Sequence, residues 1–408
     1  MKSLVLAVIV LQNATVWTPD GPVESARIVI RDDRIAAVGQ NVTVPSGATT
    51  IDLRGATVTP GLIDAATELG VTEIPTGVPT GIEGTLGREG DPVRAALRVA
   101  DTFNPRALAI RVARQQGVTG ALVVPSGGVI AGQSAWVELV DRDAIRVSEA
   151  ALHISVQGSG SEPGSRSRAF VALRAALEDA NLFRGPGNRG AYIVRRLREL
   201  GPGPLDLAAL ERVLEGSLKV IFHVDRAADI VTVLQIVRDE KLDAVLLGAR
   251  EGWLVADAIA AANVPAIVAP TANLPEDLDT LASRADNAAL LLAAGVKVAF
   301  TSGGPVTRIG RLRLVAGAAV ATGISRQAAL AAITRVPAEI LGMRTEGELR
   351  RGHRANLVVW SGDPFEPLSW PTRVFIGGTE VELRSHQDRL LERYRTLPGT
   401  AAPAASTR

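Results

Sequence analysis

The sequence has no cysteine and 4 histidines, so the histidines are the first candidates for catalysis or metal binding. The lack of cysteine excludes thiolate nucleophiles, disulfides and Cys-ligated zinc, so a bound metal would need histidine and carboxylate ligands. His223 lies at the end of the apolar run Ile221-Phe222-His223-Val224. Such a histidine is either a buried residue hydrogen-bonded to a neighbour or a general base or substrate contact. No serine-nucleophile motif, paired-carboxylate signature or Walker loop accompanies it.

Further polar residues follow other short apolar runs. Thr67 and Glu68 come after Gly61-Leu62-Ile63-Asp64, Arg250 after Leu246-Leu247-Gly248, and Ser302 after the run that ends at Thr301. If these runs are parallel strands of one barrel, their carboxyl ends converge at its mouth. We therefore predict one pocket, with His223 and Glu68 as catalytic candidates and Thr67, Arg250 and Ser302 as substrate-binding residues.

Some of these residues have structural alternatives. Glu68 could form an ion pair with a loop arginine such as Arg88, and Glu251 beside Arg250 suits the dipole at a helix start. The glycine-rich stretch 126–134 could bind an anionic group through its backbone amides. It lacks a helix N-terminus or a nearby lysine, so a phosphate site is not supported. His153 is a further candidate for the mouth.

Length and charge restrict the class of protein. A chain of 408 residues is long enough for one large α/β barrel with an accessory module. Lys and Arg number 44 against 43 Asp and Glu, which gives no electrostatic footprint for nucleic acid. After the N-terminus no apolar run reaches a membrane span of about 20 residues. The run Ser3 to Leu11 is interpreted either as a first strand or as a leader remnant, so the compartment stays open between cytoplasm and periplasm.

The elements that must position these residues change character along the chain. Short strands and turns fill both ends, which predicts one composite β-sandwich from residues 1–58 and 343–385. Strand and helix patterns alternate between them, which predicts a parallel (β/α)8 TIM-type barrel over residues 59–342. Residues 71–101 and 126–168, rich in Gly, Pro, Ser and charge, are predicted as long loops over the barrel mouth, and residues 394–408 as a disordered tail.

Three segments in this order resemble the amidohydrolase superfamily, and its imidazolonepropionase-like branch most. They are Val58-Thr59-Pro60-Gly61-Leu62-Ile63-Asp64, the stretch from Ile221 to Ile230, and the stretch from Ala328 to Trp360 that includes Gly352-His353-Arg354-Ala355-Asn356. The resemblance spans nearly the whole chain. It implies hydrolysis of C–N bonds other than peptide bonds at one or two divalent metals, such as zinc, at the carboxyl ends of barrel strands.

The residues at the family's ligand positions differ from those that the resemblance implies. Its first His-x-His falls on Ala66 and Glu68, its strand-6 histidine on Gly248 or a neighbour, and its strand-8 aspartate on Gly303. His223 is the position that survives unchanged. Because a catalytic zinc usually has three protein ligands, we expect no tightly bound metal cofactor.

Three functional hypotheses follow. The first is a protein of this family that binds a small polar molecule, with weak, metal-free or absent hydrolysis. The second is a working hydrolase that uses Glu68 and His223 with an atypical metal. The third is a non-catalytic structural partner of an intact homologue. A homo-oligomer is compatible with each.

Overall fold

Strands from both ends of the chain share one sheet. The structure is a computed structural model and describes residues 8–72, 92–157, 165–184, 202–277, 279–303 and 310–395. The 8-stranded sheet runs in the order β16-β15-β14-β5-β1-β2-β3, with β4 also paired to β1. Its strands are β1 Val8–Thr18, β2 Gly21–Arg31, β3 Arg34–Gly39, β4 Thr49–Asp52, β5 Thr57–Pro60, β14 Leu357–Trp360, β15 Pro371–Ile376 and β16 Thr379–Glu380. The predicted composite of the two chain ends is confirmed.

An irregularity in β1 lets this sheet bend around its own core. One edge of β1 pairs with β4 over Ile9–Gln12 and with β5 over Thr15–Val16. Between these two segments Asn13 has φ 57, and the pairing of β1 with β2 shifts register. A bulge of this kind sharpens twist and turns a strand from one layer to another. Leu11, Ile28 and Phe375, from three strands, meet in the core that results.

The second sheet is a nearly closed barrel. Its 8 strands follow the order β13-β12-β11-β10-β9-β8-β7-β6. They are β6 Leu62–Thr67, β7 Val118–Val123, β8 Ile130–Glu138, β9 Ile145–Ser155, β10 Lys219–Val224, β11 Ala244–Gly248, β12 Ala266–Val268 and β13 Val298–Phe300. The predicted TIM-type barrel is confirmed, with one difference: β8 runs antiparallel to both neighbours.

The predicted loop over residues 126–168 is wrong. Strands β8 and β9 lie within it and form part of the barrel wall. Every residue of β8 is buried, and its polar side chains have partners: Gln133 Nε2 donates to Ala95 O, and Ser134 Oγ donates to Ala151 O. The Gly, Ser and Gln content that suggests a loop therefore belongs to a buried strand.

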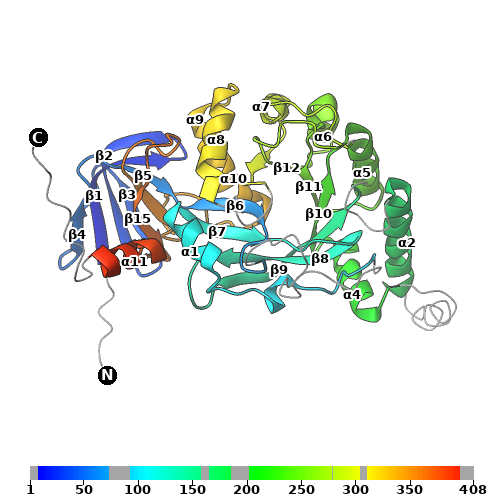
Figure 1. Cartoon of the computed structure of the whole chain (residues 1–408), viewed down its shortest axis with the longest axis horizontal. Coiled ribbons are helices and arrows are strands. Elements are labelled where there is room, and N and C mark those ends of the chain that lie inside the picture. Colours follow the sequence, from blue (N-terminus) through cyan, green and yellow to red (C-terminus); the bar gives the residue numbers. More distant parts are fainter. Residues whose placement is uncertain are drawn as a thin grey trace, which may run out of the picture.

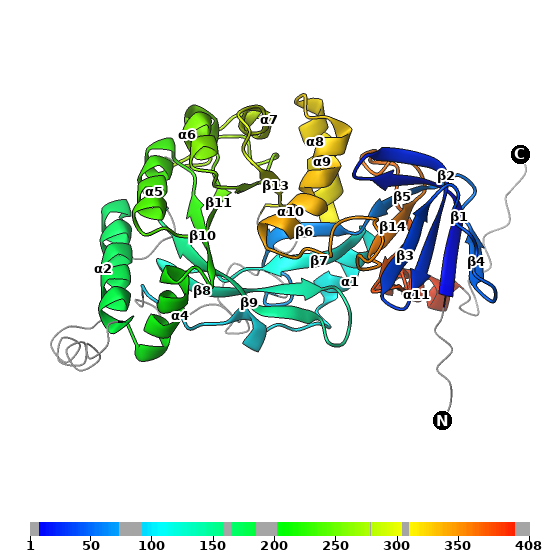
Figure 2. The same ribbon diagram turned by 180° about the vertical axis from the view of Figure 1, so that it is seen from behind.

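Helices line the outside of much of the barrel, as Figures 1 and 2 show. Two helical stretches are interrupted: residues 251–262 form a 3-10 turn and a short helix, and residues 326–341 form two helices. The helices are η1 Val99–Asp101, α1 Leu108–Gln115, α2 Arg166–Arg184, α4 Pro204–Leu214, α5 Ala227–Asp239, η2 Gly252–Val255, α6 Ala256–Ala261, α7 Asn287–Ala293, α8 Leu312–Ala321, α9 Arg326–Ala332, α10 Arg335–Ile340 and α11 His386–Arg395. Tyr394, predicted to begin a disordered tail, lies in α11. Residues 396–408 and 1–7 lie outside the described part of the chain.

Alternate residues of the barrel strands point to opposite sides, which separates the interior from the outer layer. Each barrel strand supplies at least one residue to an interior cluster, among them Ile63, Leu122, Trp136, Ala151, Ile221, Val245, Ile267 and Ala299. Their neighbours Leu62, Phe222 and Leu246 pack outward with the helices. His223, two residues beyond Ile221, therefore points into the barrel.

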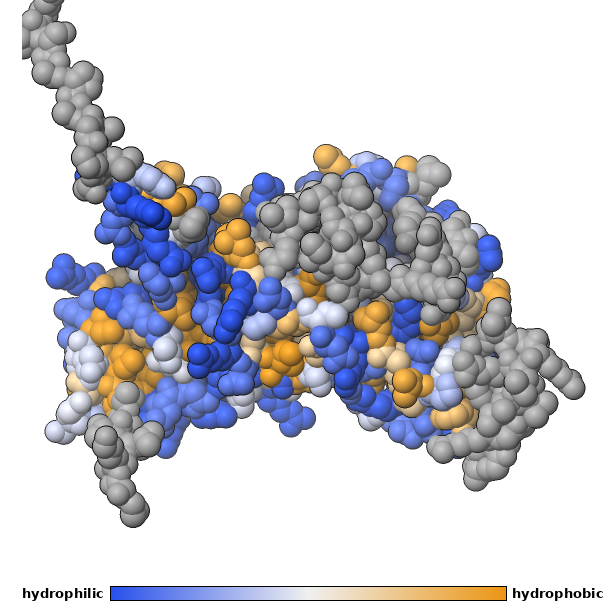
Figure 3. All heavy atoms as spheres, turned by 60° about the horizontal axis from the view of Figure 1, so that its bottom comes forward, coloured by the Kyte–Doolittle hydropathy of each residue, from blue (hydrophilic) through white to orange (hydrophobic). Residues whose placement is uncertain are grey.

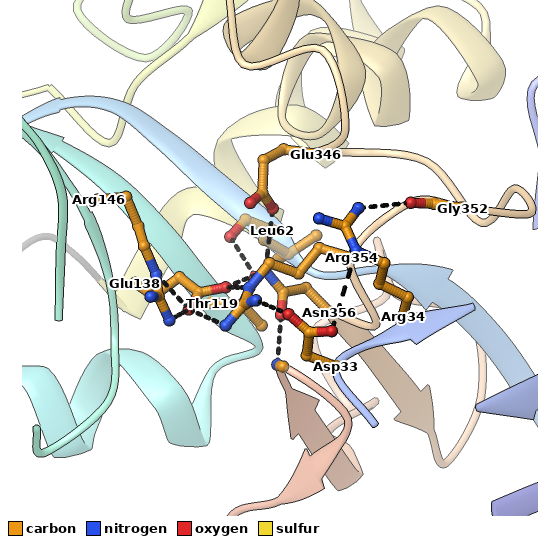
Figure 4. Close-up of polar contacts among 11 residues, drawn as sticks. Asp33, Arg34, Leu62, Thr119, Glu138, Arg146, Glu346, Gly352, Arg354 and Asn356 are labelled. Carbon is orange, nitrogen blue, oxygen red and sulfur yellow. Dashed lines mark hydrogen bonds and ion pairs between the residues drawn. The ribbon is translucent and has the colours of Figure 1, made fainter. Parts of the chain in front are cut away.

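A buried polar network joins the barrel to the sandwich (Figure 4). The Glu138 carboxylate at the end of β8 accepts hydrogen bonds from Arg146 Nε at 2.8 Å and from Arg354 Nη2 at 2.7 Å. Arg354 also pairs with Asp33 of the sandwich. Asn356 Nδ2 lies 3.0 Å from both Glu138 and Glu346, so the two carboxyl groups share one amide.

Figure 3 shows one face of the molecular surface. In the view of Figure 3, apolar residues lie in separate groups among hydrophilic ones. Among the helices that the structure describes, none is long and apolar enough to cross a bilayer.

Candidate functional site

A cavity of about 550 Å³ opens at the carboxyl ends of the barrel strands. Of the residues predicted to share one pocket, Thr67, Glu68, His223 and Arg250 line it. The complete lining is Ala66, Thr67, Glu68, Val124, Gln157, His223, Asp225, Leu247, Gly248, Arg250, Ala269, Ala272, Glu276, Thr301 and Gly303. The structure thus brings together side chains that are more than 180 residues apart in sequence, as strand ends in a barrel do.

Ser302 lies outside this lining, contrary to its predicted place in the pocket. It is buried, and its Oγ donates to Asp64 Oδ2 at 2.5 Å. Thr301 Oγ1 donates to the other oxygen of Asp64 at 2.7 Å. These bonds join the residues after β13 to β6, where the barrel closes. Ser302 is therefore placed to hold the barrel together.

His223 forms a buried pair with His153 of β9. His153 Nδ1 lies 2.8 Å from His223 Nε2, and the ring planes make an angle of 68°. Burial lowers the pKa of His223 to about 4, and burial together with the proximity of His223 brings the pKa of His153 well below its ordinary value. Both rings are therefore neutral near pH 7. His153, considered for the barrel mouth, lies fully buried behind His223.

Asp225 is a cavity residue that was not predicted from the sequence. Its carboxylate accepts from Gln157 Nε2 at 2.7 Å and from the Arg250 backbone N–H at 3.3 Å. Burial raises its pKa to about 6, although the nearby Arg250 guanidinium opposes the shift. Its position in the sequence could have indicated this role, because Asp225 directly follows β10, at the carboxyl end of a barrel strand.

The other charged residues at the mouth have identifiable partners. Arg250 Nη1 contacts Glu276 Oε2 at 2.8 Å, and its Nε lies 4.0 Å from Asp225. Glu251 accepts the backbone N–H groups of Ala227 and Ala282, each at 3.0 Å, so it organises loops rather than the cavity. Glu68 is half-buried, and Thr72 Oγ1 lies 3.4 Å from its Oε2. Arg88, the alternative partner of Glu68, lies outside the described residues.

Several positions around the cavity offer no side-chain ligand for a metal ion. Ala66, Gly248 and Gly303 border the cavity without a side-chain donor. A Cβ added at Gly248, where φ is +102, would lie 2.4 Å from Asp225 Oδ1. A Cβ at Gly303, where φ is +66, would lie 2.5 Å from the Ala269 Cβ. Within the residues that the structure describes, no group of three or more His, Asp or Glu side chains is arranged to hold a metal ion.

Comparisons with known proteins agree with the fold. A profile of the amidohydrolase family matches residues 244–367. The chain is 23% identical over 404 residues to amidohydrolase tasK of Hapsidospora irregularis, with 89% of this chain and 40% of that protein covered. It is 28% identical over 398 residues to an imidazolonepropionase of Acidiphilium cryptum, with 88% and 94% covered.

One solved structure is especially similar. The crystal structure of an amidohydrolase from Thermotoga maritima superposes with a TM-score of 0.82 and 26% identity, covering 92% of this chain and 100% of that one. These similarities, the two-sheet fold and the order of the sequence motifs together show that the chain belongs to the amidohydrolase superfamily.

Proposed function

We propose that this chain binds a small polar molecule at the barrel mouth without a tightly held metal, so that hydrolysis is weak, metal-independent or absent. Family membership itself supports a hydrolase that acts on C–N bonds. The narrower proposal is carried by one observation, the backbone conformation of Gly248 and Gly303.

This backbone leaves little possibility for a metal ligand at either position. A positive φ disfavours any residue with a side chain, and the first carbon of that side chain would overlap Asp225 or Ala269. A histidine at 248 or an aspartate at 303 would thus require the ends of β11 and β13 to rearrange. Of the family's ligand positions Glu68 and His223 remain, which is fewer than the three protein ligands of a usual catalytic zinc. Among the described residues, no further His, Asp or Glu completes a group of three with them.

The charges of the cavity favour a particular class of ligand. Glu68, Asp225 and Glu276 line it together with the single basic side chain of Arg250 among the residues described there. With a pKa of about 6, Asp225 is mostly ionised above pH 7. An acidic cavity attracts cationic groups. The proposed ligand is therefore a small molecule with an ammonium group, or a zwitterion.

Metal analysis of the full chain tests the first half of the proposal. Protein purified from zinc-containing medium is expected to hold far less than one equivalent of transition metal per chain, measured by inductively coupled plasma mass spectrometry. A Glu24→Ala variant, altered at an exposed position in the sandwich, is the control. A full equivalent in the wild type and in the control, lost in Glu68→Ala, would support the hydrolase with Glu68, His223 and an atypical metal.

Ligand binding tests the second half. Glycinamide, which carries both an ammonium group and an amide, is expected to raise the thermal unfolding midpoint. At 100 times its Kd the stabilisation would be about 2.7 kcal/mol. The effect should disappear in Glu68→Gln and persist in Glu24→Gln. If small amines, amides and zwitterions all leave the midpoint unchanged while an intact homologue copurifies, the structural-partner hypothesis replaces this one.

A further inference from the structure

The ring nitrogens of the two histidines beneath the cavity have different surroundings. His223 Nε2 faces His153 Nδ1. Among the residues that the structure describes, none forms a hydrogen bond with His223 Nδ1, and this nitrogen is not enclosed, so it faces the cavity that His223 lines. His153 Nε2, by contrast, is buried without a hydrogen-bond partner. Each neutral ring carries one proton, on one of its two nitrogens.

Two proton placements satisfy the hydrogen bond between the rings. If His153 Nδ1 carries a proton, it donates a hydrogen bond to His223 Nε2. The proton of His223 is then on its Nδ1 and points into the cavity. If His223 Nε2 carries the proton, His153 must bear its own on the buried Nε2, and a bare lone pair of His223 faces the cavity. Going from the first placement to the second thus turns His223 Nδ1 from a donor into an acceptor and His153 Nε2 from an acceptor into a donor.

Two independent observations favour the first placement. The second placement leaves a buried N–H of His153 with no acceptor. Among backbone groups, buried N–H groups without a partner are rarer than under-satisfied acceptors, and we apply the same preference to the ring N–H. The first leaves only an unused lone pair there. At the other end, the cavity is lined by the acidic side chains of Glu68, Asp225 and Glu276. A negative environment favours an N–H directed into it over a lone pair.

We infer that His153 holds His223 in the tautomer that presents its Nδ1–H to the cavity, so that His223 donates a hydrogen bond to an oxygen of the ligand and does not act as a base. The low pKa of His223 is consistent with a neutral donor. His153 is then a positioning residue, because it reaches the ligand only through His223. What this inference says of the ligand rests on the proposed function. Besides the expected ammonium group, the ligand should carry an acceptor oxygen, such as that of an amide carbonyl or a carboxylate.

The tautomer can be measured without any ligand. The chain has 4 histidines, so a long-range ¹H–¹⁵N correlation spectrum of the full ¹⁵N-labelled protein contains signals from only 4 imidazole rings, which can be assigned by substitution. His223→Gln and His153→Phe variants assign the pair, and His353→Gln, altered outside the cavity, is the control. At pH 7 we expect His223 Nδ1 at a protonated shift and its Nε2 at an unprotonated shift. The reverse assignment overturns the inference.

Two further arms test the positioning role and the ligand. In His153→Phe, His223 Nε2 loses its donor, so the Nε2–H tautomer of His223 should become populated; an unchanged tautomer there would reject the role of His153. Glycinamide should shift the His223 Nδ1–H signal in a saturable manner, whereas propylamine, which lacks an acceptor oxygen, should not. If the tautomer is as expected but neither probe shifts the signal, the tautomer stands and the proposed function fails.

Discussion

Gly248 shows how a single residue can change a site through its backbone. Asp225 Oδ1 occupies the space that a Cβ at position 248 would need. The two positions are therefore coupled, because the Asp225 carboxylate fits where it does only with glycine at residue 248. That residue 248 is a glycine is visible in the sequence, whereas its φ of +102 and the nearness of Asp225 are not.

This coupling predicts an unequal response to two similar substitutions. Gly248→Ala adds both a strained φ and an overlap with Asp225, whereas Gly323→Ala adds the same φ of +102 with nothing within 4 Å. Gly323→Ala should lower the free energy of unfolding by about 1 kcal/mol. Gly248→Ala should lower it by about 1–3 kcal/mol more. Urea unfolding of both variants measures the difference, and equal losses would argue against the close approach of Asp225.

At the scale of elements, the barrel depends on how β6 and β13 meet. The buried Asp64 of β6 accepts from the hydroxyl groups of Thr301 and Ser302, just beyond β13. Burial raises the pKa of Asp64, while these hydrogen bonds counteract the shift. A carboxyl group in the barrel wall is stable only when such donors replace its water.

Removal of one donor should therefore affect stability and not ligand binding. Ser302→Ala is expected to lower the free energy of unfolding by about 1–3 kcal/mol, because it leaves part of the Asp64 carboxyl group unpaired. Ser217→Ala removes an exposed hydroxyl that donates to Arg212 O, and it should change stability by at most about 0.5 kcal/mol. Denaturant unfolding and glycinamide titration check the two readouts. Loss of binding at unchanged stability would return Ser302 to the role of a substrate contact.

The same scale shows what could be predicted from the sequence. The alternating strands and helices of the barrel, such as β10 followed by α5, were predicted because apolar periodicity is local. Strand β8 was missed because Gln133 and Ser134 find hydrogen-bond partners in neighbouring segments that no local pattern reveals. Glu68 and Thr67 were placed at the cavity because they follow an apolar run whose carboxyl end was expected at the barrel mouth, whereas the pairing of His153 with His223 depends on the register of β9 and β10.

At the scale of the whole molecule, the barrel and the sandwich are joined through charge as well as packing. Arg354 contacts Glu138 of the barrel and Asp33 of the sandwich, and Asn356 bridges Glu138 and Glu346 (Figure 4). Although burial opposes it, hydrogen bonds from Arg354, Asn356 and Arg146 hold the pKa of Glu138 below its usual value. Glu138 is therefore the charged member of the pair, and its charge acts on the pKa of Glu346.

Glu346 should make the stability of the molecule depend on pH. Burial, and then the charge of Glu138, raise its pKa from 4.5 to about 7. Between these values the folded chain binds more protons at Glu346 than the unfolded chain does, so its contribution to stability is complete below pH 4.5 and falls as the pH rises to 7. The loss amounts to at most about 3 kcal/mol at 1.36 kcal/mol per pKa unit.

Glu346→Gln removes this titration, since the amide keeps the shape of the neutral carboxyl group and carries no charge. The variant should therefore gain stability relative to the wild type as the pH rises from 4.5 to 7.5, by up to about 3 kcal/mol. Urea unfolding at several pH values measures the gain, and Glu366→Gln, exposed outside the network, corrects for the general effect of the substitution. A constant difference between variant and wild type across this range would mean that Glu346 and Glu138 do not share a buried environment. A gain confined to Glu346→Gln would show that the junction between barrel and sandwich weakens as this carboxyl group ionises.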